Sequence, residues 1–174
     1  MKKSLLLFSV LFLLFNSVLK GQNNAPPLPQ RTVSLSKEID LNFGDFIIID
    51  NGLSGYVTIQ SDGMQSPTNN VWILNSYESP QAARLSFHLC PGRSLTPVWP
   101  SSFTLTSTQG NPITVNLNIV RIGTTSLTSG VPFFSNKGCS DTHYIYIGGT
   151  LQLLATLNYQ GTYTGSFNFT INNE

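Results

Sequence analysis

The chain has 174 residues, of which 40% are hydrophobic and only 10% are charged, and its formal net charge is +1. It has no basic block, so the clustered lysines and arginines that neutralise phosphates are missing, and no nucleic-acid partner is expected. Because the charged fraction lies far below the usual quarter or so, most of the polar surface must consist of Thr, Ser, Asn and Gln, which suits an exported β-protein.

The start of the chain has the three parts of a secretory signal. Two lysines follow the initial methionine, an apolar run extends from Leu5 to Phe15, and polar and small residues lead to Gly21. The run is shorter than the roughly 20 residues that span a bilayer. We expect a signal peptide over residues 1–21 and no transmembrane segment in the mature chain. Without residues 1–21, 6 basic and 8 acidic residues remain, a net charge of −2.

The mature chain begins with a short proline-rich stretch and then changes character. Residues 22–31 contain three prolines and predict a flexible leader. From Val33 to Phe43 apolar and polar residues alternate, with Lys37 the one exception, which is typical of a half-buried strand. No linker or internal repeat follows, so residues 32–174 are predicted to form one domain.

Further short apolar stretches are separated by Gly, Pro, Asn and Asp, and no window shows helical periodicity. This pattern predicts an all-β fold, an antiparallel immunoglobulin-like β-sandwich. The strand candidates are Phe46–Ile49, Tyr56–Ile59, Val71–Leu74, Arg84–Cys90, Phe103–Thr106, Ile113–Ile119, Tyr144–Ile147, Leu151–Leu157 and Tyr163–Ile171.

Cys90 and Cys139 are the two cysteines of the chain. In an oxidising compartment, two cysteines in one small domain usually pair. We predict a disulfide between them, which would stabilise the fold by about 4 kcal/mol in the chain-entropy model.

The same cysteines, with His88, Asp141 and His143, form the strongest candidate for a metal site. Alternate residues of two extended stretches could converge, and imidazole and thiolate ligands suit zinc or copper. A disulfide would remove the thiolates, so no metal ligand and no cofactor is expected. Whether His88, Asp141 and His143 form any other site stays open.

No catalytic residue is predicted. Ser34 and Lys37 match a Ser-x-x-Lys string, but the string lies in an alternating strand without the companion motifs of penicillin-recognising enzymes. Acidic residues such as Asp40 and Asp62 occur at strand ends and turns, where Asp is favoured for local reasons. Among aromatic residues, Trp72, Trp99 and Tyr77 could stack on sugars, although aromatic residues at strand positions usually belong to the core. Trp99, which lies between Pro97 and Pro100, is expected to be the most exposed of them.

Four segments, in order along the mature chain, resemble the exported family known as domain of unknown function 4402. They are Leu41–Gly44, Ala82–Phe87, Tyr146–Leu151 and Gly161–Phe167. The first and last also resemble pilin subunits of the spore-coat-U and archaic chaperone–usher type. The resemblance implies an immunoglobulin-like sandwich in the periplasm or on the outer surface of a Gram-negative bacterium, without catalytic residues.

Two functions are compatible with these features. The first is a non-enzymatic structural or assembly protein of the cell surface, pilin-like or part of an outer-membrane complex, with other exported or outer-membrane proteins as partners. In that case there are two alternatives. Either Val33–Phe43 is donated as a strand to a neighbouring subunit, or the domain is complete alone. We expect the domain to be complete alone. The alternative is a binding module for glycan or another exported protein, with recognition through the loops Gln65–Asn70 and Ser126–Ser140.

Overall fold

The computed structural model describes residues 33–49, 52–68, 70–74, 79–155 and 157–173. The chain divides into two units, Met1–Thr32 and Val33–Glu174, and the second contains all the described residues. The predicted signal peptide and leader lie outside the described part of the chain.

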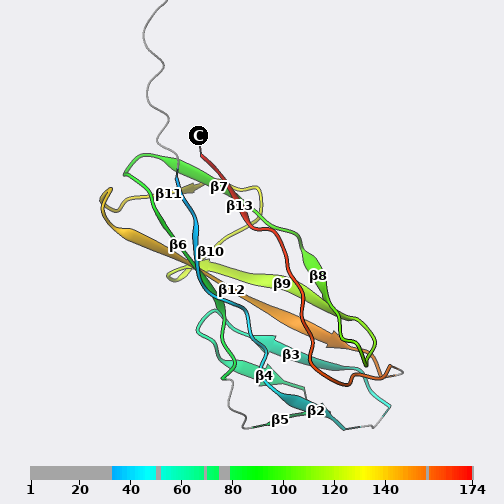
Figure 1. Ribbon diagram of the computed structural model, residues 1–174. Helices are drawn as coiled ribbons and strands as arrows, with labels where there is room; N and C mark the ends of the chain where they lie inside the picture. Colours follow the sequence, from blue (N-terminus) through cyan, green and yellow to red (C-terminus); the bar gives the residue numbers. More distant parts are fainter. Residues whose placement is uncertain (1–32, 50–51, 69, 75–78, 156, 174) are drawn as a thin grey trace, which may run out of the picture. The chain divides into compact units, whose positions relative to one another are not determined.

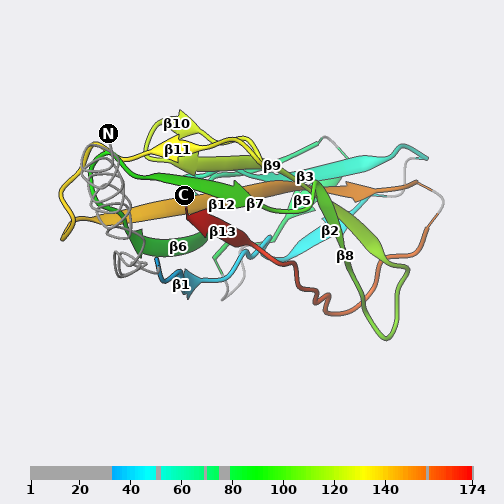
Figure 2. The same cartoon turned by 90° about the horizontal axis from the view of Figure 1, so that it is seen from above.

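The larger sheet has eight strands, all paired antiparallel, and it is organised around one long strand (Figures 1 and 2). Its members are β1 (Ser36–Ile39), β3 (Gly55–Ile59), β4 (Gln65–Pro67), β6 (Ala83–His88), β8 (Ser102–Leu105), β9 (Ile113–Ile122), β10 (Thr125–Ser126) and β12 (Thr142–Leu153).

The long strand β12 has different neighbours on its two edges. Along one edge it pairs with β9, and along the other it pairs first with β6 and then with β3. The change of neighbour occurs at Gly148 and Gly149. β1 extends the sheet beyond β6, and β4 extends it beyond β3.

Two smaller sheets complete the domain. One has the order β11-β7-β13 and the other pairs β2 with β5. Their strands are β2 (Phe46–Ile48), β5 (Val71–Ile73), β7 (Ser94–Val98), β11 (Phe133–Phe134) and β13 (Thr170–Asn173).

The sheets share one hydrophobic core. The core is built from strands whose side chains alternate between buried and exposed. In β9, for example, Ile113, Val115 and Leu117 are buried, and the residues between them are more exposed. Leu95 of β7 belongs to the same buried cluster, and Ile171 of β13 packs against it. No helix occurs among the described residues, so the predicted all-β antiparallel sandwich is confirmed.

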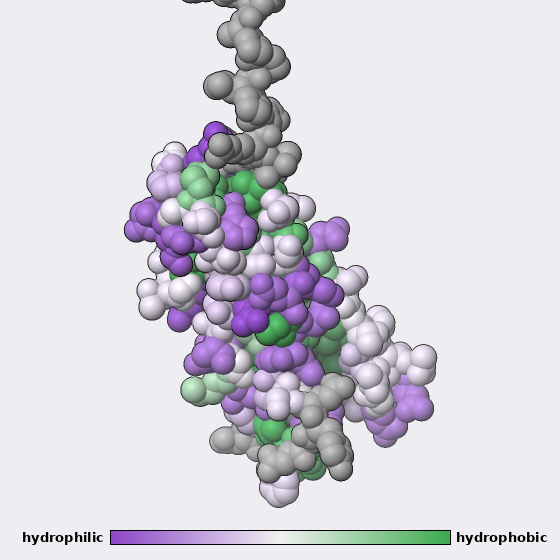
Figure 3. All heavy atoms as spheres, turned by 60° about the vertical axis from the view of Figure 1, so that its left-hand side comes forward, coloured by the Kyte–Doolittle hydropathy of each residue, from purple (hydrophilic) through white to green (hydrophobic). Residues whose placement is uncertain are grey.

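The surface has the composition that the sequence predicts. In Figure 3, pale and purple atoms cover most of the visible face, and the green hydrophobic atoms form separate patches. Ser and Thr have intermediate hydropathy, so a surface rich in them is pale rather than deep purple.

The predicted strands differ from the observed ones in four ways. The candidates Tyr144–Ile147 and Leu151–Leu157 are joined in the single strand β12, which continues through the two glycines and ends at Leu153. Only Thr170–Asn173 of the C-terminal stretch is a regular strand. Within Val33–Phe43, the regular strand is β1, which pairs with β6 of its own domain. Finally, β4, β7, β10 and β11 were not predicted, because they are short or contain proline.

The two glycines of β12 are required for close packing of three strands. A Cβ on Gly148 would collide with the carbonyl oxygen of Ile59. A Cβ on Gly149 would lie only 2.7 Å from the carbonyl oxygen of Asn116. Neither oxygen can move without breaking the β-ladder.

We therefore expect Gly148→Ala to lower the free energy of unfolding by about 1–3 kcal/mol, the usual cost of overpacking. Urea unfolding of the purified domain measures this loss. Gly138→Ala is the matched control, because a Cβ there would meet only the flexible carboxylate of Asp141. Equal stability of the two variants would contradict the packing role of Gly148.

Candidate binding groove

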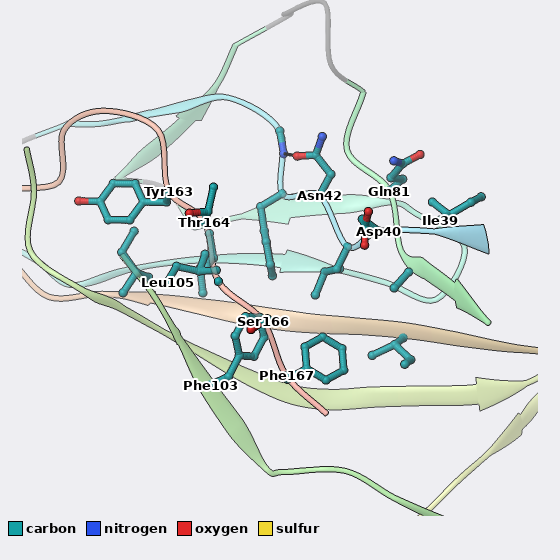
Figure 4. A pocket seen from close by; sticks show the side chains of 18 of the residues that line it. Ile39, Asp40, Asn42, Gln81, Phe103, Leu105, Tyr163, Thr164, Ser166 and Phe167 are labelled. Carbon is teal, nitrogen blue, oxygen red and sulfur yellow. Dashed lines mark hydrogen bonds between the residues drawn. The ribbon is translucent and has the colours of Figure 1, made fainter. Parts of the chain in front are cut away.

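A groove of about 950 Å³ runs along the open side of the domain (Figure 4). One wall is the N-terminal segment, residues 35–46, which contains β1. The other wall is the C-terminal segment, residues 161–169, which leads into β13. These two segments, named here the N-terminal and C-terminal walls, are distant in sequence.

The two walls differ in regularity. In the N-terminal wall, β1 ends the strand order of the larger sheet and pairs with β6. The C-terminal wall is not a regular strand before β13, and one bridge joins its Thr164 to Thr106, just after β8. The backbone groups on the groove side have no neighbouring strand among the described residues.

The C-terminal wall has few backbone hydrogen bonds. Thr164 exchanges two with Thr106, at 2.9 and 3.0 Å. From Gly165 to Phe169, no residue has a backbone hydrogen bond to another described residue, so the bridge does not continue as a ladder.

The N-terminal wall continues past β1 with one bridge. Asn42 exchanges two backbone hydrogen bonds of 2.9 Å with Gln81, which also lines the groove. Its neighbour Leu41 has no backbone hydrogen bond to a described residue. Figure 4 shows Asn42 and Gln81 together at this wall, across from Tyr163 and Thr164.

The floor of the groove is apolar. It is lined by residues from three strands of the larger sheet, β6, β9 and β12: Ala83, Leu85, Ile113, Ile147 and Leu151. All five belong to the hydrophobic core, so the groove opens directly onto the core.

The C-terminal wall is held close to β8 by aromatic contacts and a glycine. The rings of Phe103 and Phe167 are 5.0 Å apart. Trp99 and Phe169 stack with a centroid distance of 5.4 Å. A Cβ on Gly165 would lie 2.5 Å from the carbonyl oxygen of Thr104, so only glycine permits this approach.

Charge is confined to the rim of the groove. Lys37 and Asp40 form an ion pair of 2.8 Å on the N-terminal wall, and both side chains are exposed. At the other wall, burial raises the pKa of the Tyr163 phenol, so this group stays neutral. An uncharged, apolar interior with free backbone edges is suited to an extended peptide rather than to an ionic ligand.

The structure brings the predicted cysteines together at the far ends of β6 and β12. Cys90 and Cys139 lie at disulfide-bonding distance, with Cα atoms 4.0 Å apart, and are joined in the structure. This bond lies outside the groove, since neither cysteine lines it.

The histidines near the disulfide do not converge. In the pairing of β6 with β12, Thr142 lies opposite His88 and His143 lies opposite Phe87. Paired residues share a face of the sheet, so His88 and His143 project to opposite faces. His88 is exposed, whereas His143 is buried and stacked on Phe87 at 5.0 Å. Among the described residues, no cluster of three or more His, Cys, Asp or Glu is placed to hold a metal ion.

His143 and Ser135 form a buried polar pair that the sequence did not reveal. Ser135 Oγ lies 2.8 Å from His143 Nε2, and both residues are buried. The hydroxyl oxygen also accepts the backbone N–H of Lys137. The carboxylate of Asp141 does not bond to the His143 imidazole; it accepts a hydrogen bond from the backbone N–H of Gly138. The pair therefore fixes the disulfide-bearing loop to β12.

The remaining candidates are dispersed or placed differently from the prediction. Lys37 lies on the N-terminal wall and Ser34 directly precedes this wall, and both residues are exposed. Trp99, expected to be the more exposed tryptophan, is partly buried against Phe169, because its ring fills the space beside the C-terminal wall. Trp72 is 62% exposed instead. Tyr77 lies outside the described residues.

By its fold, the chain is an antiparallel β-sandwich. One side of this sandwich is open and is lined by the two walls of the groove. The family model described as Domain of unknown function (DUF4402) matches residues 33–173, and the chain belongs to this family. This confirms the resemblance seen in the four sequence segments. The resemblance to pilin subunits stays a prediction.

Searches of the curated proteins and of the solved structures find no match. In the described part of the chain, no helix has the length and apolar character needed to cross a membrane.

The buried histidine makes stability depend on pH. The pKa of His143 lies below its ordinary value, mainly because the imidazole is buried and also because Lys137 carries a positive charge nearby. A histidine in the unfolded chain has a pKa of about 6.5. Just below that pH, the unfolded chain therefore binds more protons than the folded chain. The free energy of unfolding is therefore expected to fall as the pH drops through this range.

Urea midpoints measured between about pH 7.5 and pH 5 test this dependence. His143→Gln should flatten the slope, whereas the matched variant His88→Gln, which changes an exposed imidazole, should keep it. The same slope in both variants would show that His143 is not responsible.

Proposed function

We propose that this chain is a non-enzymatic exported protein of the cell surface that joins other exported or outer-membrane proteins in an assembly. The location is the periplasm or outer surface of a Gram-negative bacterium. The observation that carries the proposal is the apolar groove between the edge strand β1 and the C-terminal wall, where residues 165–169 have no backbone hydrogen bond to another described residue.

An exposed strand edge is a hazard that domains acting alone usually cover or shorten. Here two edges and part of the core remain open on the same side of the domain. The C-terminal wall keeps Gly165, Phe167 and Phe169 without backbone partners among the described residues. This supports a domain that is completed by a partner, and it argues against our expectation that the sandwich is complete alone.

A second candidate is the binding module for glycan or another exported protein. It is favoured by Trp72 and Ile47, which lie opposite each other across the β2–β5 pair and are 62% and 45% exposed. An exposed indole beside an aliphatic side chain can stack on a sugar ring. The predicted recognition loops carry less support, because β4 and β11 occupy parts of them.

The assembly function predicts the behaviour of the chain in its own cells. An epitope-tagged full chain should be exported, and after mild crosslinking it should migrate in complexes larger than the 19.1 kDa chain. A variant without residues 1–21 is the control, and it should remain inside the cell as free monomer. An exported chain that never leaves the monomer fraction would refute the assembly function and favour the binding module.

A further inference from the structure

We propose that the outer face of the larger sheet binds an acidic polysaccharide, one whose sugar rings carry carboxylates. The outer face is the side of β6, β9 and β12 that points away from the core. It is separate from the groove, because none of Arg84, Arg121 and Tyr146, the residues at its centre, lines the groove. The inference therefore does not depend on the proposed assembly function.

The outer face follows from the alternation of side chains along β12. Ile145 and Ile147 are buried in the core, so Tyr144 and Tyr146 project from the opposite side of the sheet. Neither tyrosine belongs to the side chains that pack against the hydrophobic core. Two phenol rings are therefore presented along one strand on the surface of the domain.

Two arginines flank Tyr146 across the strands. Tyr146 lies opposite Arg84 of β6 on one edge of β12 and opposite Arg121 of β9 on the other edge. Paired residues share a face of the sheet, so the three side chains form a row in which the backbones of the two arginines stand about 10 Å apart. Without residues 1–21 the chain is net acidic. This row is thus a local concentration of positive charge that the composition alone does not explain.

The two guanidinium groups are placed differently. Nε of Arg84 donates a hydrogen bond of 2.7 Å to Glu38 of β1, and the guanidinium lies 5.5 Å from the centre of the Tyr144 ring, within range of a cation–π interaction. These contacts fix the orientation of Arg84 before any ligand binds. Arg121 is exposed and has no ion pair with a described residue. It can therefore bind a carboxylate without displacing an internal partner.

Neutral polar side chains extend the outer face beyond the arginines. Thr150 of β12 lies between Thr58 of β3 and Asn116 of β9, and the hydroxyls of Thr58 and Thr150 are 3.1 Å apart. In the next row Gln152 lies opposite Tyr56, which is 40% exposed. Hydroxyl and amide groups can both donate and accept hydrogen bonds, as sugar hydroxyls require. The face therefore has contacts for more than one sugar along β12.

This combination of groups favours an acidic sugar over an acidic peptide. The planar fork of an arginine bonds a carboxylate through two N–H groups, and a phenol ring offers a flat apolar surface to the C–H groups of a sugar ring. Peptide interfaces usually bury apolar anchors in pockets at their centre, whereas the side chains of this face are polar or phenolic. A sugar ring over Tyr146 could direct its carboxylate to Arg121, so a uronic acid would use both parts of the row.

Oligosaccharides added to the purified, oxidised chain test the inference. The probes are short oligomers of galacturonic acid and of mannuronic acid. Their methyl esters are the matched probes, since they keep the rings and lose the charge. A short polyglutamate supplies carboxylates without sugar rings. Isothermal titration calorimetry gives the dissociation constant of each probe.

We expect at least one of the two acids to bind saturably, and its methyl ester and polyglutamate to bind at least about tenfold more weakly. Arg121→Gln should weaken binding of that acid by a similar factor. Tyr146→Leu should weaken it about threefold or more, because stacking contributes less than a charged hydrogen bond. Arg93→Gln is the matched control, because Arg93 is exposed in the turn between β6 and β7 and should leave binding unchanged. Melting curves without sugar show whether each variant is folded.

Other results would overturn the inference. No binding of either acid, or equal binding of an acid and its methyl ester, would exclude the outer face as a site for acidic sugars. Polyglutamate that binds as tightly as the sugar acid would assign the face to an acidic polypeptide. Binding that is lost in Trp72→Ala and kept in Arg121→Gln would place the sugar at the β2–β5 pair. None of these results bears on assembly in cells, which is measured separately.

Discussion

The architecture depends on the backbone pairing of β12 with three other strands. Its 12 residues pair with β9 on one edge and with β6 and β3 in succession on the other. β1, β4 and β8 are then attached through these three neighbours. Gly148 and Gly149 permit this arrangement, because a side chain there would separate the strands. Since β6 carries β1, the position of the N-terminal wall of the groove follows from β12.

The opposite wall is placed by side chains more than by a regular ladder. Between the Thr106–Thr164 bridge and β13, the C-terminal segment has no regular strand. Phe103 and Trp99 contact Phe167 and Phe169 there, and these contacts hold the segment beside β8.

The sequence was sufficient for the class of fold, because alternation and turn residues are local properties. The alternating burial of Ile113, Val115 and Leu117 agrees with the pattern in the sequence. The continuity of β12 was not predictable in the same way. A Gly-Gly pair is typical of a turn, and only the close approach of Ile59 and Asn116 shows that it lies within a strand.

The candidate site was less accessible to sequence reasoning. The sequence allowed the five groups around the cysteines to converge if both stretches were extended, but the register of β6 against β12 places His88 and His143 on opposite faces. Register depends on long-range pairing, which one sequence does not reveal. The groove is harder still to predict, since it consists of edges that remain unpaired. The apolar residues of its floor have the same sequence pattern as any core.

An open apolar groove requires protection against indiscriminate association. Lys37 and Asp40 pair with each other on the N-terminal wall and remain exposed. Charged residues at a sheet edge oppose unwanted strand pairing, because an approaching chain must displace or accommodate them. On the C-terminal wall, Thr164 and Ser166 add polar side chains without charge. The groove thus combines an apolar floor, which favours burial of a ligand, with a polar rim, which opposes non-specific contact.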